Sequence, residues 1–216
     1  MTGFTLVNML GGMLIVTSTL VILAKTARKS ALLYMLQSLV LVMLLISLGF
    51  ATGSGELYIW SASAFVTKVV LVPCILLFLI KKLGDPQEVA SKVSPARSVV
   101  IIAVEVLVCF AAVKQIDLYT AAEVKPALAI SLAHFFIGLT CIITQRNIIK
   151  QIFGYCLMEN GSHVTLALLA PQAPELVEVG IATDAIFAVL IMALMVWQIY
   201  RKTNSLDASE LMELKG

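Results

Sequence analysis

The chain has 216 residues, of which 60% are hydrophobic and only 13% are charged, and its mean hydropathy is +1.00. A water-soluble domain cannot bury that much apolar surface, because its exterior must stay polar; the composition therefore excludes an ordinary soluble domain and predicts an integral membrane protein. The net charge of +2 says little, since in a membrane protein the location of charge matters more than its sum.

Seven apolar segments are predicted to be transmembrane helices, because about 20 apolar residues match the thickness of the bilayer core. In chain order they are residues 4–24, 31–51, 57–80, 98–112, 127–144, 148–169 and 176–200. The fourth is the weakest of the seven, since it carries Glu105, but omitting it would invert the orientation of everything that follows. The predicted fold class is an all-α integral membrane protein with seven transmembrane helices.

The charged residues between these segments predict the orientation. Basic residues collect after the first, third, fifth and seventh segments: Lys25, Arg28, Lys29, Lys81, Lys82, Lys92, Arg97, Arg146, Lys150, Arg201, Lys202 and Lys215. The other side carries mainly acids, with two basic exceptions: Glu56, Asp117, Glu123 and Glu175, against Lys114 and Lys125. The positive-inside rule therefore predicts a periplasmic N-terminus and a cytoplasmic C-terminus. Because its basic residues follow it, the first segment is expected to be a permanent anchor and not a cleaved signal peptide.

The order of loops and segments suggests a duplication. Residues 1–97 form an N-terminal three-helix unit with a cytoplasmic loop, residues 98–124 a connecting fourth helix, and residues 125–202 a second three-helix unit. Parallel repeats need an odd connector, so we hypothesise a 3+1+3 parallel repeat. Residues 203–216 are expected to form a cytoplasmic tail with a short, exposed amphipathic helix.

Six ionisable residues lie at least about two helical turns from the nearer end of a predicted segment: Lys68, Glu105, His134, Glu159, His163 and Asp184. An acid or a lysine at the bilayer centre costs about 2.5–3.5 kcal/mol, so an intramembrane ion or proton path is the default hypothesis. Other interpretations stay open for three of them. Lys68 could form a structural ion pair, Glu105 could face a water-filled crevice, and His134 could be a hydrogen-bonded packing residue.

The stretch "GYCLMENGSH" carries two of these residues. Glu159 and His163 are four residues apart, so they share a helical face and could form a two-step proton relay, or alternatively a polar contact between helices. Asn160 and Gly161 weaken the helix between them, and a local π-bulge or kink there would be consistent with a moving part. Asp184 follows small residues that allow close helix approach, so it is expected to turn into the bundle, opposite Glu159.

The remaining polar chemistry is sparse. Four cysteines lie within predicted segments and lack CxxC spacing, so we expect packing residues and no disulfide, metal or iron–sulfur cluster: Cys74, Cys109, Cys141 and Cys156. There is no Gly-rich phosphate loop and no GxSxG sequence. We therefore expect no cofactor, no nucleic-acid partner and no catalytic site in this chain.

The C-terminal part resembles a known family. "TQRNIIKQIFGYCLMENGSHVTLALLA", followed by "IATDAIFAVLIMALMVWQIYRK", is similar to the three-helix K subunit of proton-pumping NADH:quinone oxidoreductase and to the C subunit of multisubunit cation/proton antiporters. With its four further segments, the whole chain resembles the component E family of hydrogenase-4, membrane subunits of formate-hydrogenlyase-type complexes. The resemblance implies a multi-pass protein of the bacterial inner membrane whose partners are antiporter-like membrane subunits and, indirectly, a [NiFe]-hydrogenase arm.

The resemblance also implies roles for individual residues. In that family an acid in the middle helix and another in the last helix line the proton path. Asp184 falls on the second position, whereas Cys156 occupies the first, and Glu159 lies one turn later on the same face. The leading hypothesis is a non-catalytic subunit whose buried acids help to couple redox chemistry to proton movement. The alternatives are a subunit of a Na⁺/H⁺ antiporter complex, a structural spacer between antiporter-like subunits, or a free-standing small transporter.

Overall fold

The computed structural model describes residues 3–84, 89, 91–116 and 122–211. These residues are helical and contain no strand, which confirms the all-α prediction. The elements are α1 (Gly3–Leu23), α2 (Ala27–Thr52), α3 (Glu56–Ala64), η1 (Phe65–Leu71), α4 (Val72–Lys82), α5 (Pro95–Lys114), η2 (Ala122–Val124), α6 (Lys125–Thr144), α7 (Ile148–Leu169), α8 (Glu175–Thr203) and α9 (Ala208–Leu211).

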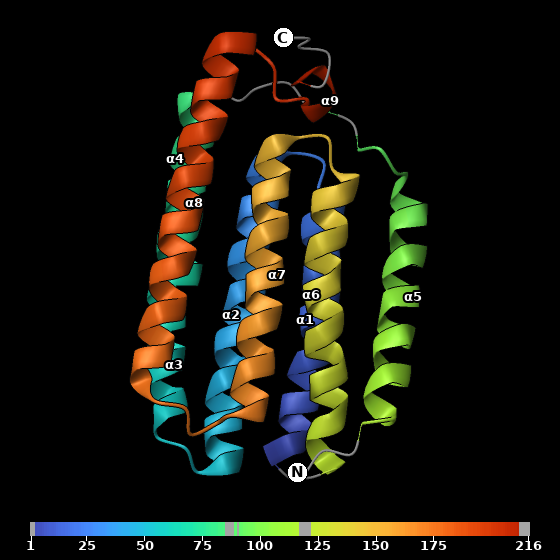
Figure 1. Ribbon diagram of the computed structural model, residues 1–216, viewed down its shortest axis with the longest axis vertical. Helices are drawn as coiled ribbons and strands as arrows, with labels where there is room; N and C mark the ends of the chain where they lie inside the picture. The colour runs from blue at the N-terminus through green and yellow to red at the C-terminus, as the bar shows by residue number, and fades with distance from the viewer. Residues whose placement is uncertain (1–2, 85–88, 90, 117–121, 212–216) are drawn as a thin grey trace.

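The long helices form an antiparallel bundle of two layers (Figure 1). One layer holds α1, α2 and the continuous α3–η1–α4 helix, and the other holds α6, α7 and α8. Across the layers α1 contacts α6, α2 contacts α7, and α4 contacts α8. The connecting helix α5 packs at the edge, beside α6. The predicted three-helix units are thus stacked helix against helix, while the internal repeat itself stays a prediction.

Among the described residues, six helices are long and apolar enough to cross a membrane: α1, α2, α3–η1–α4, α5, α6 and α8. They correspond to six of the seven predicted segments. The remaining long helix, α7, has 22 residues but carries Lys150, Glu159, Asn160 and His163, and these polar side chains keep it outside that group. Because α7 packs against α2, α6 and α8, its polar groups face protein. The seventh span therefore stays a prediction.

Glycines bring α6 and α7 into backbone contact. A Cβ atom on Gly138 would lie 2.3 Å from the Met158 nitrogen, and one on Gly161 would lie 2.5 Å from the Phe135 nitrogen. A Cβ atom on Gly154 would lie 2.9 Å from the Gly138 oxygen. Gly161 is therefore required for close helix approach, as is common between membrane helices.

The π-bulge considered at Asn160 and Gly161 does not occur, because α7 is a continuous α-helix from Ile148 to Leu169. The wide turns lie instead in η1, where the Val72 N–H bonds to the Thr67 carbonyl five residues back. Pro73 follows immediately, and it removes an N–H from the helical ladder and crowds the carbonyl four residues earlier. A run of π-helix accommodates that break.

One end of the bundle, which we call the basic end, carries the α1–α2 and α6–α7 connections and the ends of α4 and α8 (Figure 1). The other, called the far end, carries the α2–α3 and α7–α8 turns. At the basic end, Thr26 and Asn147 cap α2 and α7 through their side-chain oxygens. These caps fix where the two helices begin.

The prediction of an exposed amphipathic tail helix is wrong for residues 204–211. The tail folds back onto the α6–α7 connection, where the Ile148 N–H donates to the Leu206 carbonyl (3.0 Å) and the Ala208 N–H donates to the Arg146 carbonyl (2.8 Å). The Leu206 side chain is buried, and α9 has only four residues. Arg146 Nη2 lies 2.6 Å from Asp207 Oδ2. Residues 212–216 of the predicted tail lie outside the described residues.

Candidate functional site

A buried ion pair joins η1, in the continuous α3–η1–α4 helix, to α7. Lys68 Nζ donates to Glu159 Oε1 at 2.7 Å; the lysine side chain is fully buried and the glutamate side chain is 12% exposed. Lys68 lies in the π-helical turns of η1, and its fully buried side chain projects from them into the bundle. Both residues were candidates from sequence, and the structure pairs them.

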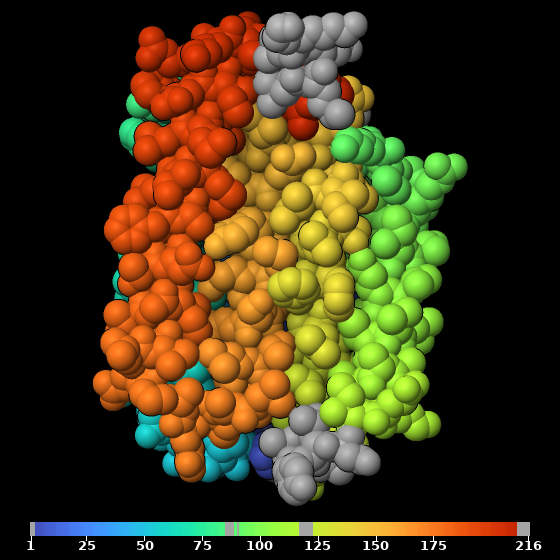
Figure 2. Space-filling view, viewed as in Figure 1, coloured from blue at the N-terminus to red at the C-terminus, as the bar shows by residue number. Residues whose placement is uncertain are grey.

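A cavity of about 290 Å³ adjoins this pair, between α7 and α8. Its lining residues are Tyr155, Met158, Glu159, Ser162, His163, Leu166, Ile181 and Asp184. Figure 2 shows that the surface is hollowed over α7, between α8 and α6. The structure thus brings together three predicted site residues, Glu159, His163 and Asp184, at one cavity. Cys156, which occupies the position of the family's first acid, is buried and is not among the lining residues.

The prediction that Asp184 turns into the bundle is wrong. Its side chain is exposed at the surface of this chain, although it lines the cavity. The buried face of α8 carries residues three or four positions apart: Glu178, Ala182, Ala185, Val189, Ala193 and Val196. Asp184 lies off this stripe, because the small residue at the inward position is Ala185.

Sequence reasoning missed Glu178, which lies on the buried stripe. It is 1% exposed, and its Oε2 lies 2.9 Å from His163 Nε2. Glu178 was overlooked because it lies in the first turn of α8, close to the outer loop. Its phase relative to Ala182 and Ala185 could have found it, since positions i, i+4 and i+7 share one helical face.

His134 belongs to a separate, fully buried network on the other side of α7. Its Nδ1 lies 2.8 Å from Ser18 Oγ and its Nε2 lies 3.2 Å from Gln37 Nε2. The Asn160 amide donates to Gln37 Oε1 at 2.9 Å. Because the Ser18 hydroxyl donates to the Leu14 carbonyl (2.5 Å), it accepts from Nδ1–H of the histidine, and Nε2 then accepts from Gln37. This arrangement suits a neutral imidazole.

Glu105 lies apart from both groups. It is half-buried on α5, where its Oε1 accepts a short hydrogen bond from the Thr140 hydroxyl of α6. Its Oε2 is buried and has no partner within residues 3–84, 89, 91–116 and 122–211. Of the predicted site residues, Glu105 is therefore the one that the structure places at the edge of the bundle. Over the same ranges, no three His, Cys, Asp or Glu side chains are grouped to hold a metal ion.

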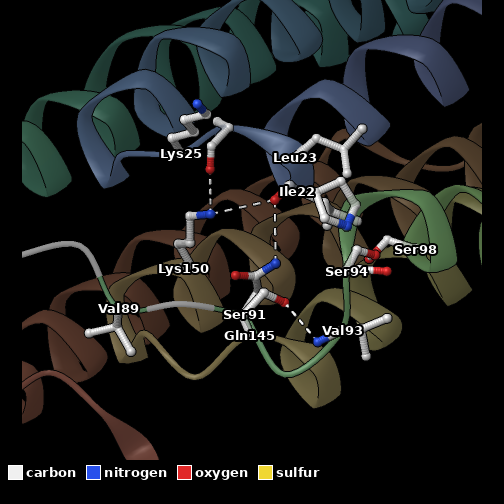
Figure 3. Close-up of a pocket in the computed structure, with 12 residues that line it drawn as sticks. Ile22, Leu23, Lys25, Val89, Ser91, Val93, Ser94, Ser98, Gln145 and Lys150 are labelled. Atoms are coloured by element: carbon white, nitrogen blue, oxygen red, sulfur yellow. Dashed lines mark hydrogen bonds between the residues drawn. The ribbon is translucent and has the colours of Figure 1, made fainter.

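A second cavity, of about 360 Å³, lies at the basic end and shares no lining residue with the first (Figure 3). Lys150 donates to the carbonyls of Ile22 and Ala24 there, and Gln145 Nε2 donates to the Ile22 carbonyl at 3.3 Å. These carbonyls end α1, where a cation complements the helix dipole. Lys150 therefore has a structural role as a cap for α1.

Known proteins are similar to this chain over its full length. The chain is 50% identical, over 218 aligned residues and 100% of both chains, to "Hydrogenase-4 component E" of Escherichia coli (strain K12). The protein of the same description from Shigella flexneri matches equally. The chain belongs to the hydrogenase-4 component E family. An uncharacterized protein of Mycobacterium tuberculosis (strain ATCC 25618 / H37Rv) is 23% identical over 97% of this chain and 96% of its own length. No solved structure was found to match.

The C-terminal part of the chain also matches a family model. The model described as NADH-ubiquinone/plastoquinone oxidoreductase chain 4L matches residues 126–216. These residues include α7 and α8, which carry Glu159, His163, Glu178 and Asp184. The resemblances to component E and to the K-type subunit are thereby confirmed, while the one to the antiporter C subunit stays a prediction. The matched region is the one that holds the cavity.

Proposed function

We propose that this component E homologue is a multi-pass subunit of the bacterial inner membrane, part of a complex I-like hydrogenase complex, and that its Glu159 cavity moves protons. The redox chemistry takes place in other subunits, in a [NiFe]-hydrogenase arm. The observation that carries the proposal is the Lys68–Glu159 pair beside a cavity that also holds His163 and Asp184. Family membership supports the assembly, and the buried charges support the ion path.

In this proposal, the Lys68–Glu159 pair controls whether Glu159 carries a proton. A carboxylate 2.7 Å from a buried ammonium is held in its charged form, whereas one that loses its cation in a low-dielectric site takes up a proton. Lys68 lies on the π-helical segment η1, so a small change in those wide turns would move the ammonium away from Glu159. Protonation of Glu159 then follows from hydration of the cavity, and return of Lys68 expels the proton.

The distribution of charged residues indicates which side of the membrane each end of the bundle faces. The basic end collects the lysines and arginines and is assigned to the cytoplasm by the positive-inside rule, which puts the far end in the periplasm and makes α7 the seventh span. The helices α5 and α8 expose many large apolar side chains, among them Leu107 (69%) and Leu176 (79%). We assign these faces to lipid and to neighbouring antiporter-like membrane subunits.

The test is proton uptake by inverted membrane vesicles that contain the assembled complex, driven by hydrogenase turnover. Glu159→Gln and Asp184→Asn are expected to keep assembly and hydrogenase turnover but to lower proton uptake, because neither variant can carry a proton. Ser162→Ala is the matched control, since Ser162 lines the same cavity without a charge. Unchanged proton uptake in both acid variants would favour a structural spacer, and uptake that requires Na⁺ would favour an antiporter subunit.

A further inference from the structure

A group of polar atoms beside the cavity lacks partners. Trp60 Nε1, His163 Nδ1 and Glu178 Oε1 are buried without a hydrogen-bond partner within the described parts of the chain. All three residues are almost completely buried, at 0%, 1% and 1% exposure. Buried polar groups are nearly always hydrogen-bonded, to protein or to ordered water, so a concentration of unpartnered atoms indicates a bound ligand.

His163 contacts both of the other side chains. The Trp60 and His163 rings lie 5.5 Å apart between centroids and are inclined by 44°. His163 Nε2 lies 2.9 Å from Glu178 Oε2, but the ring N–H is not aligned with that oxygen, so the contact lacks the geometry of a hydrogen bond. An indole donor, a carboxylate acceptor and an imidazole together match water, which both donates and accepts.

The positions of Trp60, His163 and Glu178 indicate which parts of the bundle they connect. Trp60 lies in α3 and Glu178 in the first turn of α8, and both helices begin at the far end (Figure 1). His163 belongs to this group and also lines the cavity with Glu159. We propose that Trp60, His163 and Glu178 form a hydrated proton-transfer site that connects the far end of the bundle with the Glu159 cavity. This inference rests on the proposed function of that cavity.

The proton balance is simple. A protonated Glu159 gives its proton, through bound water on the cavity side, to Nδ1 of neutral His163, which leaves a carboxylate and an imidazolium. The imidazolium releases its Nε2 proton to the Glu178 carboxylate, which passes it on to the far end. His163 is then neutral again, with its proton on Nδ1, and returning that proton to Nε2 resets the relay. No oxidant or reductant takes part.

The Trp60 indole has a positioning role in this site. Its N–H holds water against the carboxylate, while its ring fixes the plane of the imidazole. Trp60→Phe keeps the ring and removes the donor, so it separates these two contributions. Tyr58→Phe is the matched control, because Tyr58 lies on the same helix but is 43% exposed.

The experiment uses the assembled complex in vesicles and has two readouts. The first is proton uptake per hydrogenase turnover, which Glu178→Gln should lower on the order of a hundredfold, as for loss of a proton-transferring side chain, and Trp60→Phe by less. The second is the infrared O–H stretch of bound water, identified by its shift in H₂¹⁸O. We expect a band that disappears in Glu178→Gln and in Trp60→Phe and persists in Tyr58→Phe. Glu178→Asp serves if Glu178→Gln fails to assemble, and should keep the band and slow proton uptake.

The reference variant Glu159→Gln separates the two proposals. If it lowers proton uptake while Glu178→Gln leaves both uptake and the water band unchanged, the hydrated site is wrong and the proposed function stands. If Glu159→Gln leaves proton uptake normal, the proposed function fails, and with it the transfer role of His163 and Glu178. In that case a persisting water band in Trp60→Phe would also exclude the hydrated site.

Discussion

Two histidines in neighbouring helices of this bundle are equally buried but differ in their hydrogen-bond partners and in access to a cavity. His134, in α6, has a partner at each ring nitrogen, Ser18 and Gln37. His163, in α7, lies 2.9 Å from the Glu178 carboxylate without an aligned hydrogen bond and borders a cavity. The same residue type is therefore held by partners on both ring nitrogens in one place and by neither in the other.

The two sides of α7 differ in the same way. Toward α2, the Asn160 amide nitrogen donates into a neutral amide network, and toward α6, Gly161 brings the backbones together. Toward α8, Glu159 and His163 border the cavity. A neutral hydrogen-bonded network specifies packing, whereas charge beside a cavity can change its state. Burial alone therefore does not distinguish the two sides of α7, whereas charge beside a cavity does.

The largest effect on stability is expected at the Lys68–Glu159 ion pair. Lys68→Met leaves the Glu159 carboxylate without its cation and should lower the free energy of unfolding by about 3 kcal/mol, the low end for a broken buried pair, because Glu159 borders the cavity. The double variant Lys68→Met/Glu159→Gln should recover most of that loss. Unfolding in detergent, followed by circular dichroism, measures both. Equal losses in the single and double variants would show that the pair itself contributes little.

A steric effect is expected on the α6 side. The Cβ atom in Gly161→Ala would lie 2.5 Å from the Phe135 nitrogen, so α6 and α7 must separate, and we expect a loss of stability of about 3 kcal/mol, the upper part of the range for overpacking. Gly180→Ala is the matched control, because no atom lies within 4 Å of its Cβ position. Equal thermal unfolding temperatures for the two variants would rule out the close packing.

A smaller effect is expected in the amide network. Gln37→Leu leaves Nε2 of His134 without its donor and the Asn160 amide without its acceptor, and should reduce stability by about 2 kcal/mol. Proton uptake by the assembled complex should nevertheless stay normal, since the network is neutral. A variant that folds normally but loses proton uptake would place His134 in the path, and the contrast between the two histidines would collapse.

The smallest effect is expected at Asp207, whose carboxylate helps to hold residues 204–211 against the α6–α7 connection. Partial desolvation raises the pKa of Asp207, but hydrogen bonds from Ser209 and Arg146 and the arginine charge outweigh it, so the pKa lies below its usual value. A lowered folded-state pKa stabilises the docked tail above the unfolded value of about 3.9, and the contribution is lost as pH falls through the folded value. Hydrogen exchange of residues 204–211 should thus increase, after correction for intrinsic rates, in Asp207→Asn at neutral pH. Exchange equal to that of the unmodified chain would contradict this.

The sequence was informative where length and apolar content decide the structure. The predicted segment at residues 148–169 coincides with α7, since polar turns bound it on both sides. The i, i+4 spacing correctly predicted that Glu159 and His163 share a face. Apolar content could not establish α7 as a span, because the polar residues that line its cavity and its buried contacts lower its hydropathy.

The direction in which individual side chains point within the bundle was harder to predict from the sequence. The π-helical turns of η1 change the helical phase at Lys68, so no regular helical wheel could have found Glu159 as its partner. Small residues flank Asp184 on several sides and did not reveal which one faces inward. Glu178 was missed because acids near a helix start usually face solvent, and only its register with Ala182 and Ala185 distinguishes it.

The central claim is that the α8 side of α7 moves protons and the α2 side does not. It is tested most directly by the number of protons taken up per hydrogen molecule turned over, compared between Glu159→Gln and Gln37→Leu in the same vesicles. We predict a lower ratio in Glu159→Gln and an unchanged ratio in Gln37→Leu, with hydrogenase turnover retained in both. An unchanged ratio in Glu159→Gln, or an equal decrease in the two variants, would contradict the claim.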